Sequence, residues 1–351
     1  MQAIFFLLII LGLGLLMVIH EAGHYYAARL FGMRVTKFSI GMPPVLARFQ
    51  PKGSPTTFQI GAIPFFAYVQ IAGMNPLEEV DPNDKGSYAN ASLLGRVVTI
   101  FAGSFANYVV ASVFFFAALV LTGEPHATTQ ITVIKDQPAA LAGMRDKDRV
   151  LEVDGVKVES WDQFRTLIGA RANVPTPVVV DHGGERLTLT VTPSATGEGG
   201  QGRIGAQTVQ VSTPIATSTA AKQALLLPPQ VVAGVVVGLA RVVTLKQKAE
   251  LGGPVAIVRE GAKAAEKGVG ELLGFLGLLS ASLAAFNLLP FPALDGGRLV
   301  FLGYEALSRR RPDAIIEAHV HVVGFFMLLA LMVVVTWHDS RDFVRSIFGR
   351  M

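Results

Sequence analysis

The sequence predicts a polytopic α-helical membrane protein with four transmembrane helices, a membrane-associated β region and one small extracytoplasmic α+β domain. Hydrophobic residues make up 51% of the 351 residues and charged residues only 16%, whereas a soluble domain carries about 25% charged residues. Several apolar segments also approach or exceed the roughly 20 residues that a spanning helix needs. Between them lie two stretches with the alternation and the turn residues of β structure.

Composition also excludes several kinds of site. The chain has no cysteine, which rules out disulfides, thiolate metal sites and cysteine nucleophiles. Any bound metal must therefore use His, Asp or Glu. The net charge is only +4 and no block of Lys and Arg occurs, so we expect no nucleic acid partner. The expected surroundings are a lipid bilayer.

We predict membrane-spanning helices at about 3–30, 97–122, 272–289 and 320–337. The first lacks the preceding positive charge and the following A-x-A-like site of a signal peptide. A fifth apolar stretch, Leu225–Val243, contains Pro228-Pro229 and Arg241. We interpret the segment 214–270 around it as interfacial or amphipathic helix.

The charges between the helices predict an orientation, because short loops rich in Lys and Arg stay in the cytoplasm. The connection between the first two helices is rich in both, and Arg309–Arg311 lie between the third and the fourth. Both connections are therefore predicted inside. The N-terminus and the segment from Gly123 to about Gly270 are then outside.

These boundaries divide the chain into four parts. The N-terminal membrane part, 1–122, includes a β region at about 36–74 that we expect to dip into the membrane, where its backbone must be paired or shielded. Residues 123–213 form the outer α+β domain, with a helix from Ser160 to Gly169 and Ser160 at its N-cap. The interfacial segment and the C-terminal membrane part, 271–351, follow.

The first apolar helix ends in the motif His20-Glu21-Ala22-Gly23-His24. Residues four apart share one helix face, so His20 and His24 can bind one ion. Two neutral imidazoles suit Zn²⁺, and Glu21 can reach a water at the ion without binding the metal. A chance polar cluster is the alternative. Each ionisable group costs about 2.5–3.5 kcal/mol near the bilayer centre, so three together favour the metal site.

A catalytic zinc usually has three protein ligands, and Asp295 is the best candidate for the third. Prolines before it break the third helix, and Gly296-Gly297 after it allow close backbone approach. The alternative is a turn that caps the next helix. The arginines after Asp295 predict that it lies on the same side of the membrane as His24, provided that Leu225–Val243 does not span the membrane.

Two asparagines remain ambiguous. A lone Asn in a membrane helix, such as Asn107, most often makes a hydrogen bond between helices. If it faces the metal, its amide could instead hold a substrate carbonyl or an oxyanion. Asn287, which precedes the candidate ligand Asp295, carries the same two interpretations.

Together these motifs resemble the bacterial site-2 proteases, intramembrane zinc metalloproteases with an outer PDZ domain. The resemblance is carried by His20–His24, the run Phe38–Gly41, the motif Asn287–Gly297 and a PDZ-like Pro138–Met144. It covers almost the whole chain in order. It implies that residues 123–213 are a PDZ-like domain and that the region at about 36–74 is re-entrant and pairs with an unwound substrate.

The resemblance also implies roles and partners. His20, His24 and Asp295 would bind Zn²⁺, Glu21 would be the base, and Asn287 and Asn107 would support substrate binding or the transition state. Substrates would be single-span membrane proteins such as anti-sigma factors, or remnant signal peptides. The protein would lie in the bacterial cytoplasmic (inner) membrane, with the active site towards the cytoplasm and the PDZ-like domain outside.

Two other classes of function compete with hydrolysis. A non-catalytic membrane scaffold could use the PDZ-like domain to bind partners and keep the metal as a structural element. Glu21 argues against it, since a structural site needs no base. A metal transporter is disfavoured because the candidate ligands form one cluster without a second intramembrane acidic relay.

Overall fold

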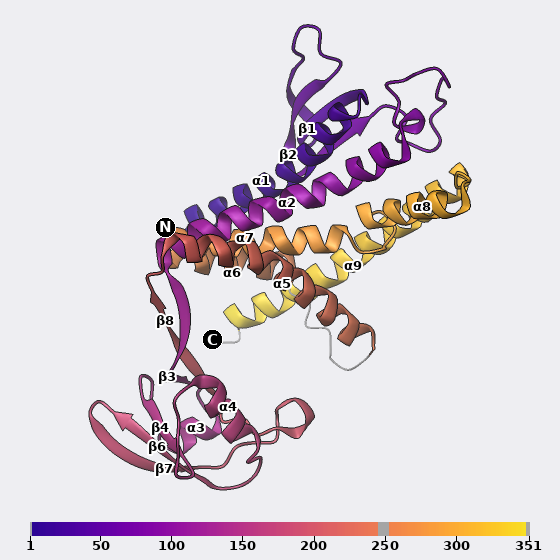
Figure 1. Ribbon diagram of the computed structural model, residues 1–351. Coiled ribbons are helices and arrows are strands. Elements are labelled where there is room, and N and C mark those ends of the chain that lie inside the picture. Colours follow the sequence, from indigo (N-terminus) through magenta and orange to yellow (C-terminus); the bar gives the residue numbers. More distant parts are fainter. Residues whose placement is uncertain (1, 245–252, 349–351) are drawn as a thin grey trace. The chain divides into compact units, whose positions relative to one another are not determined.

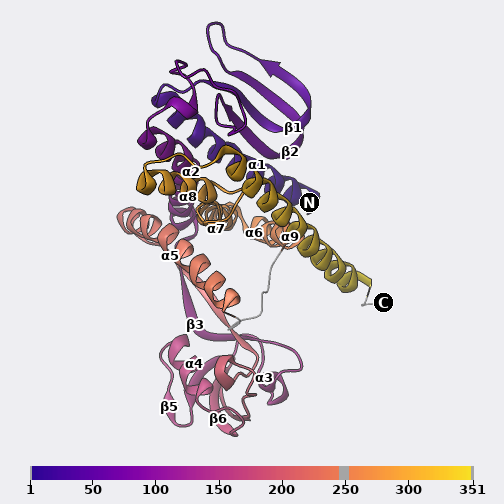
Figure 2. The ribbon, with the colours of Figure 1, turned by 90° about the vertical axis from the view of Figure 1, so that its right-hand side faces the viewer.

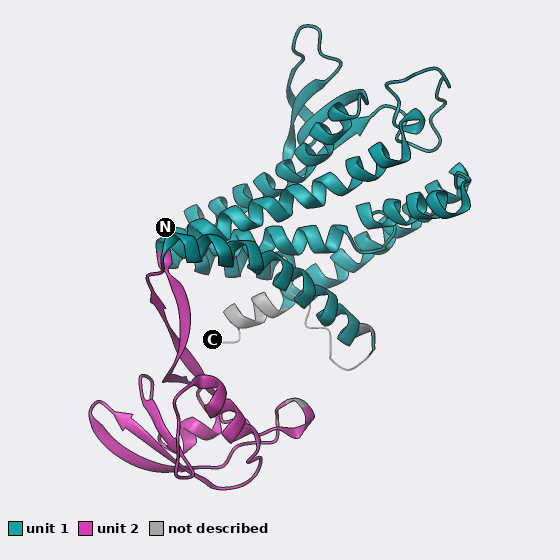
Figure 3. Cartoon of the chain, in the orientation of Figure 1, with its two compact units in different colours: residues 1–121, 216–351 teal, residues 122–215 magenta. Residues whose placement is uncertain are grey.

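A computed structural model describes residues 2–244 and 253–348. The chain forms two compact units (Figure 3). The first combines Met1–Leu121 with Ala216–Met351, and the second is Thr122–Ile215. Each unit is described by itself.

The first unit is mainly helical (Figure 1). Its helices are α1 (Gln2–Leu30), α2 (Leu93–Thr122, which reaches the second unit), α5 (Thr217–Val243), α6 (Pro254–Lys267), α7 (Val269–Asn287), α8 (Asp295–Ser308) and α9 (Ala314–Phe348). A short 3₁₀ helix, Tyr88–Asn90, precedes α2.

Five helices in the described ranges are long and apolar enough to cross a membrane: α1, α2, α5, α7 and α9. Three of them, α1, α2 and α9, contain predicted spans, and α7 covers the predicted span 272–289 up to Asn287. The fifth, α5, has Pro228 and Pro229 inside it, and the sequence predicts an interfacial location for this segment. Ala224 of α5 packs with Ala111, Phe115 and Ala281, which ties α5 to α2 and α7.

Two glycines bring α1 and α2 into backbone contact. A Cβ built on Gly23 of α1 would lie 2.3 Å from the backbone oxygen of Ala102, and one built on Gly103 of α2 would lie 2.3 Å from Nε2 of His24. Any side chain at either position would force the helices apart, as at the small-residue contacts of membrane helices. This close crossing presents α2 directly to the histidines of α1.

The predicted β region contains β1 (Val35–Phe49) and β2 (Thr57–Ile71). Each is a single strand of 15 residues. Both strands bend, because residues 37–40 of β1 pair with 67–70 of β2 and also with 57–60. The last part of β2 packs on α1 (Figure 2), so one end of the sheet lies beside the helix that carries the metal motif.

A buried ion pair joins α8 to α2. Arg96 donates to both carboxylate oxygens of Glu305, at 2.8 and 2.6 Å, and the side chains are only 8% and 14% exposed. The Arg96 guanidinium holds the pKa of the Glu305 carboxyl below its usual value. Because removing one partner of such a pair leaves an uncompensated buried charge, this contact fixes α8 against α2.

The second unit contains a six-stranded sheet with the order β7-β6-β4-β3-β8, to which β5 is added beside β4. Its core lies between the sheet and α4 and is rich in Val and Ile. Ser160 accepts a hydrogen bond from the backbone N–H of Gln163, which confirms the predicted N-cap. The elements are β3 (Glu124–Val133), α3 (Pro138–Leu141), β4 (Arg149–Val153), β5 (Val156–Lys157), α4 (Trp161–Gly169), β6 (Thr176–His182), β7 (Glu185–Val191), the 3₁₀ helix Glu198–Gly200 and β8 (Ala206–Thr213).

Candidate metal centre

The histidines of the predicted motif lie on one face of α1, about two turns before its end. His20 is 5% and His24 is 6% exposed. Their rings meet edge to face, with centroids 4.8 Å apart. The apolar sequence on both sides continues the helix through the motif, and this regular helix sets the separation of the two imidazoles.

Asp295 is the first residue of α8. The loop before it folds back over the start of this helix: a Cβ on Gly296 would lie 2.0 Å from the backbone oxygen of Leu289. Within the loop, Ala293 has a φ of 72°, and its N–H donates to Nδ1 of His321 at 2.9 Å. The glycine after Asp295 therefore permits the tight turn that aims the carboxylate at α1.

The structure brings His20, His24 and Asp295 together from two distant parts of the chain. Nε2 of His20 and Nε2 of His24 are 3.2 Å apart, and Oδ2 of Asp295 lies 3.1 Å from the first and 3.3 Å from the second. A tetrahedral zinc with bonds of about 2.0–2.1 Å separates its ligand atoms by about 3.3 Å. These three atoms form such a group within the described residues.

The proton positions also fit a cation. Nδ1 of His24 donates to the backbone oxygen of Thr99 at 2.8 Å, so the neutral ring presents a lone pair at Nε2. Oδ2 of Asp295 is buried and accepts no hydrogen bond from the described residues. A lone pair and a carboxylate oxygen in contact repel each other unless a cation or a proton lies between them, so these residues fit Zn²⁺.

Glu21 lies beside this group and is not part of it. Its Oε2 accepts a hydrogen bond from the backbone N–H of Val69 in β2, at 3.0 Å. The carboxylate is therefore held between α1 and β2, one residue away from His20. This arrangement is compatible with a base that acts on a water at the metal without binding the metal.

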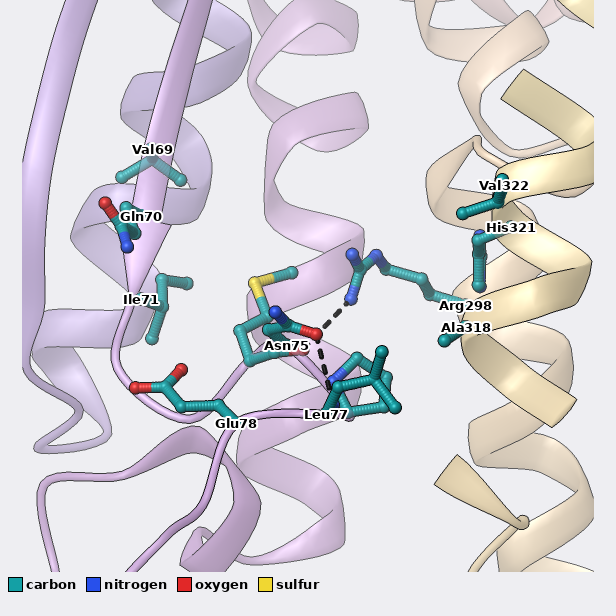
Figure 4. A pocket seen from close by; sticks show the side chains of 12 residues that line it. Val69, Gln70, Ile71, Asn75, Leu77, Glu78, Arg298, Ala318, His321 and Val322 are labelled. Atoms are coloured by element: carbon teal, nitrogen blue, oxygen red, sulfur yellow. Dashed lines mark hydrogen bonds between the residues drawn. The ribbon is translucent and has the colours of Figure 1, made fainter. Parts of the chain in front are cut away.

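A cavity of about 440 Å³ opens along the part of β2 that contacts Glu21. Figure 4 shows Val69 and Gln70 on one side of it and Arg298 and His321 on the other. Arg298 reaches across from α8, with Nη1 3.5 Å from the backbone oxygen of Met74. Val69 links this cavity to Glu21, although neither Glu21 nor the three candidate ligands line it.

The two asparagines differ in position. Asn107 is 0% exposed and its amide lies against the ring of His20. Asn287 is the last residue of α7 and is only partly buried. Among the described residues, hydrogen bonds join Asn107 to one candidate ligand and Asn287 to none.

Two contacts of the centre were not identified from the sequence. Thr99 acts through its backbone oxygen, so its side chain gave no signal. Gly103 leaves room for the His24 ring, and the spacing Thr99–Gly103 on an apolar helix is the small-residue pattern that indicates close helix contact. That pattern could have predicted the crossing, but not which ring it accommodates.

Comparison with known proteins identifies a family that matches most of the chain and relatives that share nearly its full length. Residues 8–331 match the family described as peptidase family M50. A Clostridium perfringens protein whose name assigns it as a zinc metalloprotease is 34% identical over 334 residues, 94% of this chain and 96% of that protein. A similarly named Agrobacterium fabrum protein is 31% identical, over 95% of both chains.

Two further similarities are more distant. The zinc metalloprotease RasP of Geobacillus kaustophilus is 28% identical over 411 residues, 94% of this chain and 96% of RasP. The solved PDZ domain of an SdrC-like protein from Listeria monocytogenes is 22% identical and has a TM-score of 0.21. It covers 24% of this chain and 86% of that domain.

Proposed function

Because the chain belongs to peptidase family M50, the site-2 protease family, we propose that it hydrolyses peptide bonds within transmembrane segments of single-span membrane proteins. It is an integral membrane protein of a zinc metalloprotease family. The observation that carries the proposal is the group of His20, His24 and Asp295 beside the carboxylate of Glu21. Anti-sigma factors and remnant signal peptides are the substrates that we propose.

In this proposal His20, His24 and Asp295 hold Zn²⁺. When bound, the ion would supply Lewis-acid chemistry, polarising a carbonyl and making a water molecule more acidic. Oε2 of Glu21 is held by Val69, which leaves Oε1 to take a proton from the attacking water. Glu21 then returns this proton to the nitrogen of the leaving amine as the C–N bond breaks.

The cavity beside β2 supports an extended substrate. A transmembrane helix hides its peptide bonds in internal hydrogen bonds, so hydrolysis requires local unwinding. An unwound segment could add to β2 by backbone hydrogen bonds. The N–H of Val69 donates to Glu21, so a chain paired with neighbouring residues of β2 would pass next to the base. We propose that Asn287, the partly buried last residue of α7, helps to bind the substrate or to stabilise the transition state.

We further propose that four of the five long apolar helices cross the membrane. Asp295 lies within 3.3 Å of both histidines, so the ends of α1 and α7 must reach the same depth. This requires the chain between α2 and α7 to begin and end on one side, with α5 interfacial. The charged loops then place the centre towards the cytoplasm and the second unit, with its PDZ-like sequence motif, outside a bacterial inner membrane.

Single cysteines test this topology, since the chain has none of its own. We expect Thr217→Cys and Thr244→Cys, at the two ends of α5, to react with an impermeant thiol reagent from the outer side. Arg310→Cys should react only from the inner side. The unsubstituted protein is the control. Labelling of Thr244→Cys from the inner side alone would show that α5 crosses the membrane and would contradict the four-span topology.

Cleavage in lipid vesicles tests the activity. We expect the purified protein to cut a labelled single-span peptide, to stop when a zinc chelator is added, and to recover when zinc is restored. Peptides with Gly or Pro near the middle should be cut faster than one with a polyleucine core, because they unwind more easily. Binding without cleavage would favour the scaffold, and chelator-resistant cleavage would exclude a metalloprotease.

A further inference from the structure

Asn107 contacts His20 at the ring nitrogen that does not face Asp295. Its Nδ2 lies 3.4 Å from Nδ1 of His20. Its Oδ1 is buried and has no hydrogen-bond partner among the described residues. Because the whole side chain is 0% exposed, no open solvent reaches this acceptor. An unpaired buried acceptor costs about 1–3 kcal/mol, so a better arrangement of the same groups is favoured.

The metal site requires the opposite orientation of the amide. A neutral imidazole has one N–H and one lone pair. If Nε2 of His20 offers its lone pair to an ion, Nδ1 must carry the proton, and the NH₂ of Asn107 would then face another donor. Turning the terminal amide by 180° exchanges Nδ2 and Oδ1. Oδ1 then meets Nδ1–H of His20 and accepts its proton.

We propose that Asn107 is a positioning residue: its Oδ1 accepts the Nδ1 proton of His20 and so fixes the tautomer in which Nε2 binds zinc. The other histidine already has this arrangement, because Nδ1 of His24 donates to the backbone oxygen of Thr99. Both acceptors belong to α2. This helix therefore sets the proton positions of both imidazoles of α1.

This inference rests on the proposed zinc site and changes the expected role of one residue. The family resemblance implies substrate or transition-state support for Asn107. Its complete burial and its contact with the His20 ring instead favour an action through the ligand. Ser280 of α7 donates to the backbone oxygen of Asn107 at 2.8 Å, which anchors this turn of α2 and leaves the side chain directed at His20.

The proposal is tested by measuring zinc affinity in a variant that is expected not to hydrolyse peptides. In Glu21→Gln protein, the zinc dissociation constant is measured by competition with a chromophoric chelator. Adding Asn107→Leu removes the acceptor and should weaken zinc binding 10–100-fold, the usual cost of losing such a partner, in order of magnitude. Adding Asn107→Asp keeps an acceptor oxygen and should retain affinity within a few-fold. Ser112→Ala, which removes another buried polar group of α2, should leave affinity unchanged.

The outcomes separate this inference from the proposed function. If the Glu21→Gln parent binds no zinc, the proposed site itself fails. If the parent binds zinc and Asn107→Leu binds it equally tightly, or if Asn107→Asp weakens it as much as Asn107→Leu, the positioning role is overturned.

A measurement on unaltered Asn107 covers the case in which Asn107→Leu fails to fold. Nitrogen-15 and proton spectra of His20 in zinc-loaded Glu21→Gln protein should show Nδ1 protonated, with the strongly downfield proton shift of a hydrogen bond to Asn107. An Nδ1 proton with the shift of an imidazole that makes no hydrogen bond would overturn the proposal.

Discussion

The Glu21→Gln protein is expected to bind zinc normally and to lose hydrolysis. Gln has nearly the same shape, and its oxygen can still accept the N–H of Val69, which lies 3.0 Å from Glu21 Oε2. The amide cannot take a proton from water at neutral pH. General base catalysis contributes about 10²–10⁴-fold, so we expect the cleavage rate to fall by at least this factor. Zinc content and peptide cleavage, measured on the same preparation, check this result.

The matched control is Glu260→Gln, which neutralises an exposed carboxylate of α6 that pairs with Lys263. It should leave both zinc content and cleavage unchanged. If Glu21→Gln cuts the peptide at the normal rate, Glu21 is not the base. If Glu21→Gln loses zinc as well as activity, Glu21 contributes to metal binding. Its assignment as a base that does not bind the metal is then wrong.

Asp295→Ala is expected to have the second large effect, a loss of zinc. The substitution removes one of three ligand atoms and leaves the two Nε2 atoms, 3.2 Å apart, without the carboxylate charge. An outer partner of a ligand is worth about 10–100-fold in affinity, and losing a ligand should cost more. Metal analysis after dialysis should show far less than one zinc per chain, with cleavage at background.

Asp162→Ala is the control for this loss, because Asp162 is an exposed carboxylate in the first turn of α4. Asp295→Asn gives a finer comparison, since it keeps the shape and removes the charge. Unchanged zinc stoichiometry in Asp295→Ala would remove this residue from the ligand set.

Chemistry determines which parts of the centre could be predicted from sequence. The spacing of His20 and His24 directly predicts a shared helix face, because a helix repeats every 3.6 residues. Asp295 needed a second argument, from charge and topology, since its distance along the chain carries no geometric information. In the structure the three residues meet within 3.3 Å. Thr99 could not be predicted, because any residue supplies a backbone oxygen.

The same limit applies to the fold. Alternation predicted β structure near Thr36–Met74, but the pairing of 37–40 with two parts of β2 depends on contacts between distant residues. Hydropathy alone did not decide whether α5 crosses the membrane. Its length and composition allow it to span, whereas its prolines and arginine favour an interfacial location. Asn107 was recognised as a polar group in an apolar helix, but its contact with His20 required the crossing at Gly103.

The two helices that carry the candidate ligands, α1 and α8, are both held against α2. Gly23 and Gly103 hold α1 against α2, and the Arg96–Glu305 pair holds α8, which begins with Asp295, against the same helix. Separating any two would open a backbone contact or expose a buried charge. If the cavity beside β2 widens to admit a polypeptide, we expect β2 or α9, which line it and carry none of the candidate ligands, to move.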